Sequence, residues 1–174
     1  MDRVATHRNL LGACVWGVRW ATSVAVSENT LGLERADGGV WRLVGGGGAA
    51  QFGLVNDYLG YLADRNYSPR TVRAYGFDLL ALCRWLVEQG MGLDAVTSVV
   101  LLDFLRACRE AKVPGRPSGN VVSMSGQPLD RYAAATINHR LAAITGLFAF
   151  GQMRDPDAPN PVPKGRQARS ANRG

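Results

Sequence analysis

The sequence predicts a mainly α-helical fold, a four-helix bundle preceded by a short β-hairpin and a flexible N-terminal extension. Four segments between residues 51 and 151 carry apolar residues at alternating intervals of three and four, the period of a helix with one buried face. Asp37-Gly38-Gly39 separates two short apolar runs, which favours a hairpin because glycine adopts the positive φ of a tight turn. Residues 45–48 are all glycine, which is typical of a linker.

These features divide the chain into three parts. Residues 1–48 form an N-terminal extension that contains the hairpin, with strands expected over Leu31–Arg35 and Val40–Val44, and the glycine linker. Residues 49–153 form a helical domain, and residues 154–174 form a proline-rich, basic linker or tail. The first twenty residues have no clear period and are expected to be poorly ordered.

The first two helices have recognisable ends. The first is expected from Gln51 to about Asn66, and the second from Pro69, with Ser68 as its N-cap and Gly90 as its C-cap. Their predicted buried stripes are Phe52, Val55, Leu59 and Leu62, and then Val72, Tyr75, Leu79, Leu82 and Leu86. The side of the second helix opposite its stripe is predicted to carry Arg70, Arg73, Phe77 and Arg84.

The last two helices flank a long loop. Thr97 or Asp94 is expected to cap the third helix, which ends before Pro114. Residues 113–130 are rich in glycine and proline and predict a loop, and the fourth helix is expected over residues 132–151. The predicted stripes are Val100 or Leu101, Phe104, Leu105 and Cys108 in the third helix, and Ile137, Leu141, Ile144 and Phe148 in the fourth. The other face of the fourth helix is predicted to hold Thr136, His139, Arg140 and Ala143.

Charge and composition narrow the classes of partner. The formal net charge is +6, of which residues 113–174 supply +5, so an acidic partner is expected, with nucleic acid first and an anionic membrane surface second. No run of 18 apolar residues predicts a membrane span. The three cysteines form no C-x-x-C pair, which argues against a zinc site or a disulfide framework and fits a reducing cytoplasm. We expect no cofactor and no small-molecule substrate.

The second and fourth helices carry the residues best suited to bind DNA. A capped helix with arginines at its start and an apolar back can present cations to a phosphate, although the same arginines would also suit a merely solvated face. Arg70, Arg73, Arg140 and Lys164 are predicted to meet phosphates, and Thr71, Thr136 and Asn138 to reach a sugar, a phosphate or a base edge.

Three motifs resemble one family. Residues 68–75 (Ser-Pro-Arg-Thr-Val-Arg-Ala-Tyr), followed by Asp78-Leu79, resemble the second helix of the core-binding (SAM-like) domain of tyrosine recombinases, the phage integrases. Residues 135–144, with Phe148 and Phe150 after them, resemble the last helix of that domain, and residues 160–162 (Asn-Pro-Val) resemble the segment that leads to the catalytic domain. The resemblance covers about residues 51–166.

The resemblance implies a domain that grips one side of a recombination site through its second and fourth helices. That role would fall to Arg70, Thr71, Arg73, Thr136, Asn138 and Arg140. His139 is a weaker candidate, because a second basic residue is common at this place in the family and an unperturbed histidine is mostly neutral at pH 7. The implied function is DNA binding in site-specific recombination or integration, in the cytoplasm and at the nucleoid.

Strand cleavage is not expected of this chain. Catalysis in the family uses a tyrosine nucleophile and a His-x-x-Arg motif, whereas His7 and His139 are followed three places on by Leu10 and Ala142. We therefore expect either an integrase truncated before its catalytic domain or a free-standing DNA-binding module. The alternative is a helical protein-interaction module that joins or inhibits an assembly of recombinase protomers, through a first helix with Tyr58 or Tyr61 exposed.

Overall fold

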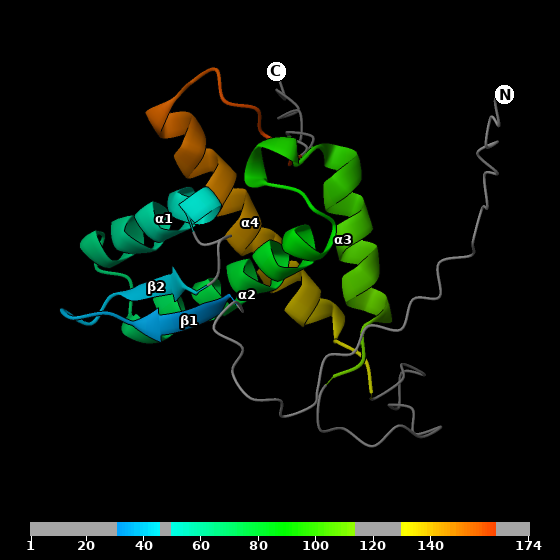
Figure 1. Cartoon of the computed structure of the whole chain (residues 1–174). Helices are drawn as coiled ribbons and strands as arrows, with labels where there is room; N and C mark the ends of the chain where they lie inside the picture. The colour runs from blue at the N-terminus through cyan, green and yellow to red at the C-terminus, as the bar shows by residue number, and fades with distance from the viewer. Residues whose placement is uncertain (1–30, 46–49, 114–129, 163–174) are drawn as a thin grey trace, which may run out of the picture.

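The computed structural model describes residues 31–45, 50–113 and 130–162, and within them four helices follow a two-stranded antiparallel hairpin (Figure 1). The strands are β1 (Gly32–Arg35) and β2 (Trp41–Val44), and the helices are α1 (Gly53–Asp64), α2 (Pro69–Glu88), α3 (Ser98–Glu110) and α4 (Ala134–Arg154). Short 3₁₀ turns, Ala50–Phe52 and Leu93–Ala95, stand before α1 and α3. The fold class is thus the predicted one. The predictions for the first thirty residues, most of the glycine linker, the long loop and the basic tail with Lys164 lie outside the described residues.

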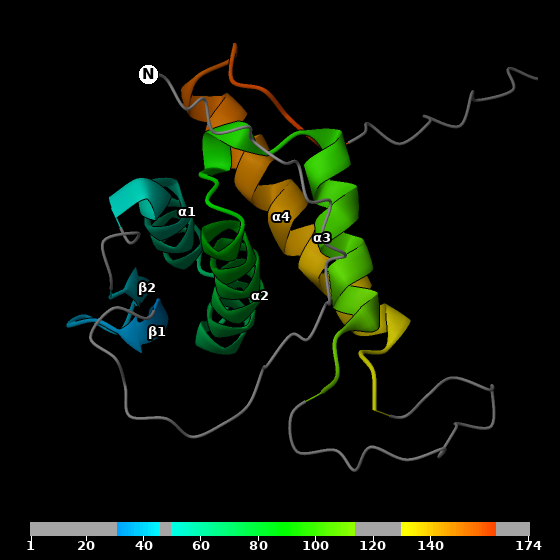
Figure 2. The same ribbon diagram turned by 45° about the vertical axis from the view of Figure 1, so that its right-hand side comes forward.

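Helix α2 occupies the middle of the molecule, with α1 and the hairpin on one side and α3 and α4 on the other (Figure 2). Both of its predicted ends are confirmed. The Ser68 hydroxyl accepts a hydrogen bond of 3.1 Å from the N–H of Thr71. At the other end Gly90 has a φ of 68°. The N–H of Gly90 bonds to the carbonyl of Val87 and the N–H of Met91 to that of Leu86, which is a Schellman motif.

The predicted apolar stripes form the core. Most of their members are fully buried, whereas Tyr75 and Leu141 are half-buried and pack against the core from its edge. Two alternatives that the sequence leaves open in α3 are decided. Thr97, and not Asp94, caps the helix by accepting from the N–H of Val100. Leu101, and not Val100, is the buried member of the stripe.

The hairpin shares this core, although the sequence assigns it to an extension outside the helical domain. Leu31 and Leu43 are 5% and 3% exposed and belong to the same apolar cluster as the helices. The side-chain amide of Asn56 in α1 bonds to both the N–H and the C=O of Leu43, at 2.7 and 3.2 Å. The glycine run indicates a flexible connection, but it carries no signal of where the preceding strands dock.

Docking of the hairpin corrects one prediction for α2. The side opposite its stripe is not simply solvated, because β1 and β2 pack along it. The Arg84 guanidinium donates two hydrogen bonds, of 2.9 and 2.6 Å, to the carbonyl of Leu31. About two turns earlier in α2, Leu33 packs so closely on Gly76 that an added Cβ would lie 2.8 Å from a Leu33 methyl carbon.

Helix α4 is buried on a wider face than its sequence pattern predicts. It contacts α1, α2 and α3, so Ala143, which was expected on the outward face, is fully buried. Arg140, expected on the same face, has a side chain that is only 12% exposed. The helix also continues three residues past Gly151, to Arg154.

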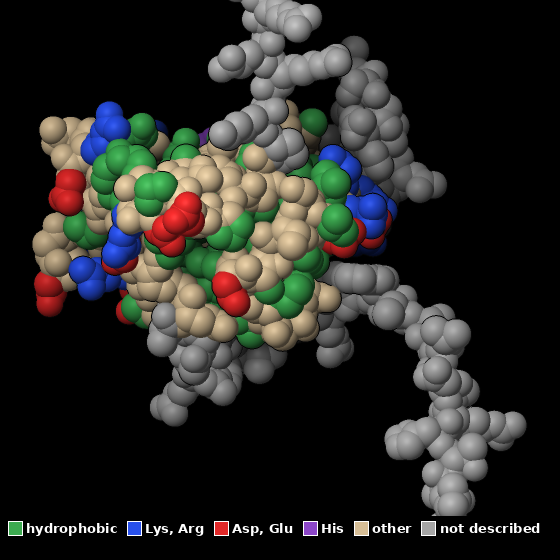
Figure 3. All heavy atoms as spheres, turned by 90° about the horizontal axis from the view of Figure 1, so that it is seen from above, with side chains coloured by type: hydrophobic (Ala, Val, Ile, Leu, Met, Phe, Trp, Pro, Cys, Tyr) green, Lys and Arg blue, Asp and Glu red, His purple; other side chains and the backbone are tan. Residues whose placement is uncertain are grey.

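The surface shows no continuous basic area on the face in Figure 3. Charged side chains of both signs are scattered there, with lysine and arginine toward the edge on the α1 side and the edge on the α3 side. Among the described helices, none combines the length and the apolar character needed to cross a membrane.

Candidate nucleic-acid interface

Asp78 of α2 joins the first halves of α2 and α4. Its carboxylate lies 2.5 Å from Nδ1 of His139 through one oxygen and 3.5 Å from Nε of Arg140 through the other. The second distance is that of an ion pair without hydrogen-bond geometry, since Nε of Arg140 has no hydrogen-bond partner. The edge of the Tyr75 ring meets the His139 ring, with 5.4 Å between centroids. Two helices that are distant in the chain are thereby locked side by side where the predicted DNA-binding residues lie.

The protonation of this cluster follows from its burial. Asp78 is 13% exposed, and desolvation raises the pKa of its carboxyl, although His139 and Arg140 partly offset the rise. When the Asp78 carboxyl is ionised it can only accept a hydrogen bond, and Nδ1 of His139 then carries the proton. The other ring nitrogen, Nε2, has no partner among the described residues, and the His139 side chain is 49% exposed. Asp78 therefore orients the imidazole and leaves one nitrogen for an external ligand.

Arg140 is turned inward, not toward solvent as the sequence predicts. Its guanidinium lies 4.3 Å from the centroid of the Tyr132 ring, and Nη1 lies 3.3 Å from Sγ of Cys108. Burial raises the pKa of the Cys108 thiol, although Arg140 opposes the rise. The sequence misses this placement because the partners come from α2, α3 and the segment before α4. A contact between Arg140 and DNA stays a prediction.

Arg70 and Arg73 are exposed, and neither makes a hydrogen bond or an ion pair within the described part of the chain. Arg73 instead lies over two aromatic rings, 5.5 Å from the centroid of Trp41 and 4.9 Å from that of Phe77. A cation–π contact leaves the N–H donors of a guanidinium available. Other arginines are bonded to acceptors within the chain, namely Arg35, Arg65, Arg84, Arg106, Arg131 and Arg154.

The remaining predicted residues differ in exposure. Thr71 is half-buried, and its hydroxyl lies 2.8 Å from that of Ser68. Thr136 is half-buried, whereas Asn138 is exposed. The structure therefore places Arg70 and Thr71 at the start of α2, and Asn138 and His139 near the start of the adjacent α4. Lys164 lies outside the described residues.

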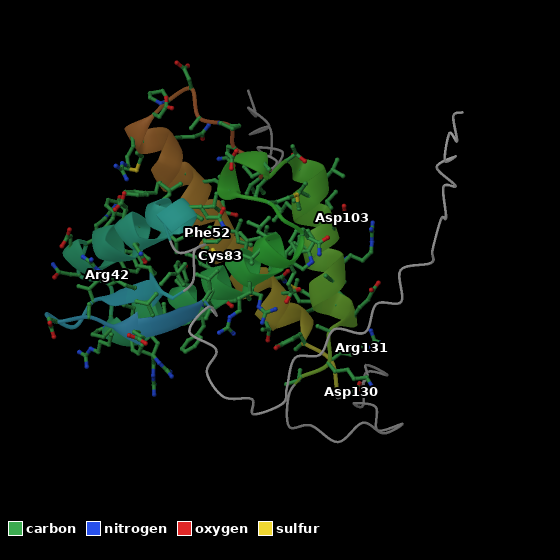
Figure 4. The ribbon with its side chains drawn as sticks, in the orientation of Figure 1. Arg42, Phe52, Cys83, Asp103, Asp130 and Arg131 are labelled. Atoms are coloured by element: carbon green, nitrogen blue, oxygen red, sulfur yellow. The ribbon has the colours of Figure 1, made fainter. Side chains whose placement is uncertain are left out.

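The base of the long loop also lies near the start of α4 (Figure 4). The N–H of Val113 bonds to the carbonyl of Asp130 at 2.7 Å. Arg131 donates to the carbonyls of Arg109 and Glu110 at the end of α3, both at 3.3 Å, where a cation also complements the helix dipole. No local sequence signal points to Arg131, since this contact spans more than twenty residues.

The described residues are electrically neutral as a set. They contain twelve basic and twelve acidic residues, so the whole excess of +6 comes from segments outside them. Residues 163–174 alone carry Lys164, Arg166, Arg169 and Arg173 without an acid. We call the exposed residues Arg70, Arg73, Asn138 and His139 in the first halves of α2 and α4 the α2–α4 face; it does not stand out by an overall positive charge.

The described part of the chain contains no candidate metal site. No group of three or more histidine, cysteine or acidic residues there is placed to hold a metal ion. A cavity beside Trp85, Cys108 and Arg140 measures about 30 Å³, which suits a water molecule and not an organic substrate. The candidate site is thus a surface and not a pocket.

A family model, the phage integrase N-terminal SAM-like domain, matches residues 55–154, which is more than half of the chain. The chain belongs to the phage integrase family. The matched residues run from α1 to the last residue of α4, so the four helices are those of the integrase domain and the hairpin lies outside the match. The resemblance stated from the sequence is confirmed. Neither the search of curated proteins nor the search of solved structures found a match.

Proposed function

We propose that this integrase-family domain binds the duplex DNA of a recombination site through the first halves of α2 and α4, and so serves site-specific recombination or integration. One observation carries the proposal: Asp78 of α2 holds His139 of α4, while Arg70 and Arg73 in the first half of α2 are exposed guanidinium groups with no acceptor among the described residues. Unpaired cations next to short polar side chains are the combination that phosphate and base contacts require.

The residues divide into contacts and supports. Arg70 and Arg73 would bind phosphate oxygens, and Asn138 has the amide that reads adenine when it reaches the major groove. Nε2 of His139 would donate to a phosphate when the ring is charged. Asp78 supports this arrangement from within, as does Arg140, which is mostly buried.

The proposal is tested by titrating the full chain into a fluorescently labelled random-sequence duplex and following the anisotropy. Arg70→Ala and Asn138→Ala should each weaken binding about three- to tenfold, equivalent to about 0.7–1.4 kcal/mol. Arg154→Ala is the matched control, since it removes the same charge from the far end of α4, where Arg154 pairs with Asp57. Equal losses in Arg70→Ala and Arg154→Ala would show that only net charge matters and would contradict the proposed face.

The basic tail should supply much of the salt dependence. The described residues are neutral, so deleting residues 163–174 removes four cations and no acid. The slope of log affinity against log salt should become less steep by up to about 3.6 on deletion. An unchanged slope would exclude the tail, and Lys164 with it, from the interface.

We further propose that the chain binds DNA without cutting it. Tyr58, one of the five tyrosines, is 4% exposed, and burial raises its pKa to about 12, which suits a core residue and not a nucleophile. Incubation with a nicked suicide duplex should therefore leave no covalent protein–DNA adduct on a denaturing gel. A tyrosine-linked adduct would overturn this part of the proposal.

A protein-interaction role is the second candidate, and α3 favours it more than α1 does. Tyr58 is buried and Tyr61 is half-buried and packs against the core, contrary to the expected exposure of one of them. By contrast Val99 and Leu102 of α3 are 67% and 58% exposed, and a groove of about 500 Å³ runs between α3 and the end of α2. Association with a recombinase that survives nuclease and high salt, and is lost in Leu102→Asp, would support this role.

A further inference from the structure

Arg73 is an exposed side chain that contacts an aromatic ring of the hairpin and another of α2. Arg73 lies between Trp41 of β2 and Phe77 of α2, with its guanidinium 5.5 and 4.9 Å from the two ring centroids. Phe77 is 44% exposed, so this arrangement lies at the surface and not in the core. An arginine side chain on an open helix surface samples many rotamers, and two flanking rings restrict it to few.

The position of Trp41 is fixed independently of Arg73. Trp41 pairs with Arg35 in the antiparallel register, and strand alternation places it on the same face as Leu43, which points into the core. Asn56 holds the backbone of Leu43 through two hydrogen bonds, and Arg84 holds the carbonyl of Leu31. The indole is therefore held on a rigid support, and a long-range fold contact determines where Arg73 points.

The charges around the rings favour an anionic partner. Three arginines near these rings are exposed, namely Arg35, Arg70 and Arg73. Arg70 lies one turn before Arg73 on α2. The acid of β1, Glu34, is opposite Arg42 in the strand register, and strand alternation places it on the other face of the hairpin from Trp41. A guanidinium stacked on rings keeps its N–H donors, and it desolvates at a lower cost than an ammonium, which suits phosphate binding.

We propose that Trp41 positions Arg73 for a phosphate of duplex DNA, so that the hairpin, which lies outside the family match, is part of the DNA interface. This inference rests on the proposed function. Trp41 acts through Arg73, and Arg35 extends the cationic edge next to it. The partner is the phosphate backbone at the flank of the α2–α4 face.

The test is a double-mutant cycle measured by anisotropy with the full chain and a labelled random-sequence duplex. Trp41→Ala should weaken binding about three- to fivefold, the size of a cation–π contact at an exposed site. The same substitution should have no effect in an Arg73→Ala background, since there is then no guanidinium to position. Trp41→Phe should restore most of the affinity, because phenylalanine retains a ring.

Val44→Ala is the matched control, since it shortens an apolar side chain on the same strand away from Arg73, and thermal unfolding of each variant verifies that it folds. Equal losses for Trp41→Ala with and without Arg73, or none in Trp41→Ala while Arg73→Ala weakens binding, would overturn the inference and leave the proposed function standing. Failure of the unsubstituted chain to bind DNA at low salt would instead remove the proposed function.

Discussion

Different kinds of contact hold the two sides of α2. On the α4 side a partly buried carboxylate, that of Asp78, meets His139 and Arg140. On the hairpin side the contacts are buried leucines, a helix glycine and the hydrogen bonds that Arg84 donates to a backbone carbonyl. The difference teaches that the hairpin contributes stability with little dependence on pH, whereas the contacts on the α4 side depend on pH.

Removing apolar volume from the hairpin side should have the largest effect. Leu43→Ala should lower the free energy of unfolding by about 2–4 kcal/mol, because the side chain is 3% exposed and a cavity would remain. Urea titration followed by circular dichroism measures it. Leu102→Ala removes the same atoms from a position that is 58% exposed and should change stability by less than about 0.5 kcal/mol. Similar values for the two would mean that the hairpin is not part of the core.

Removing the Arg84 guanidinium, the charged donor on the hairpin side, should lower the free energy of unfolding by less than Leu43→Ala does. Arg84→Ala leaves the carbonyl of Leu31 without its two hydrogen bonds, and the expected loss is about 1.5–3 kcal/mol. Arg106→Ala breaks a solvent-exposed pair with Asp103 and should cost less than about 1 kcal/mol. Chemical denaturation of the two variants decides whether the bond to Leu31 contributes more than a surface pair does.

The α4 side should respond mainly to pH. The carboxyl of Asp78 has a pKa raised by burial, so the folded chain holds this proton more tightly than the unfolded chain. Its contribution to stability is present below the ordinary pKa of about 3.9 and is lost as the pH rises through the raised value. The stability of the wild type relative to Asp78→Asn should therefore be greatest in acid and decline toward neutral pH. Thermal unfolding of both proteins across this range measures the difference, and a difference that increased with pH would contradict the sign.

The smallest change in stability is expected when a methyl group is added to a helix glycine, either at Gly60, away from the hairpin, or at Gly76, against it. Gly60→Ala in α1 meets no atom within 4 Å and should stabilise the protein by about 0.4–1 kcal/mol through helix propensity and chain entropy. Gly76→Ala should lose most of that gain, because its Cβ would lie 2.8 Å from a Leu33 methyl carbon that must move aside. Equal gains in melting temperature for the two variants would show that the hairpin does not press on α2.

The helices could be predicted from the sequence because their signals are local. Ser68 and Thr97 cap where expected, Gly90 ends α2, and the stripes are buried. The placement of the arginines could not be predicted, because periodicity separates a buried stripe from the rest but does not say what covers the rest. Arg84 and Arg140 fall outside their stripes and nevertheless have partners within the fold. Arg84 bonds to Leu31, just before β1, and Arg140 contacts Cys108 of α3 and Tyr132.

The same limit applies to the candidate site. The motifs select Arg70, Arg73, Asn138 and His139, which the structure shows exposed, and the roles of these residues stay predictions. Asp78 appears in the sequence only as part of a family motif, and its position between His139 and Arg140 of α4 depends on a contact across sixty residues. Trp41 carries no signal at all, because a strand pattern does not indicate which helix will face it.

The fit of Leu33 against Gly76 links two positions more than forty residues apart in the chain. A homologue with a side chain larger than a methyl group at the position of Gly76 is expected to have a smaller residue at the position of Leu33, or no hairpin in this place. Covariation of these two columns in an alignment would therefore indicate which integrase relatives carry the hairpin here.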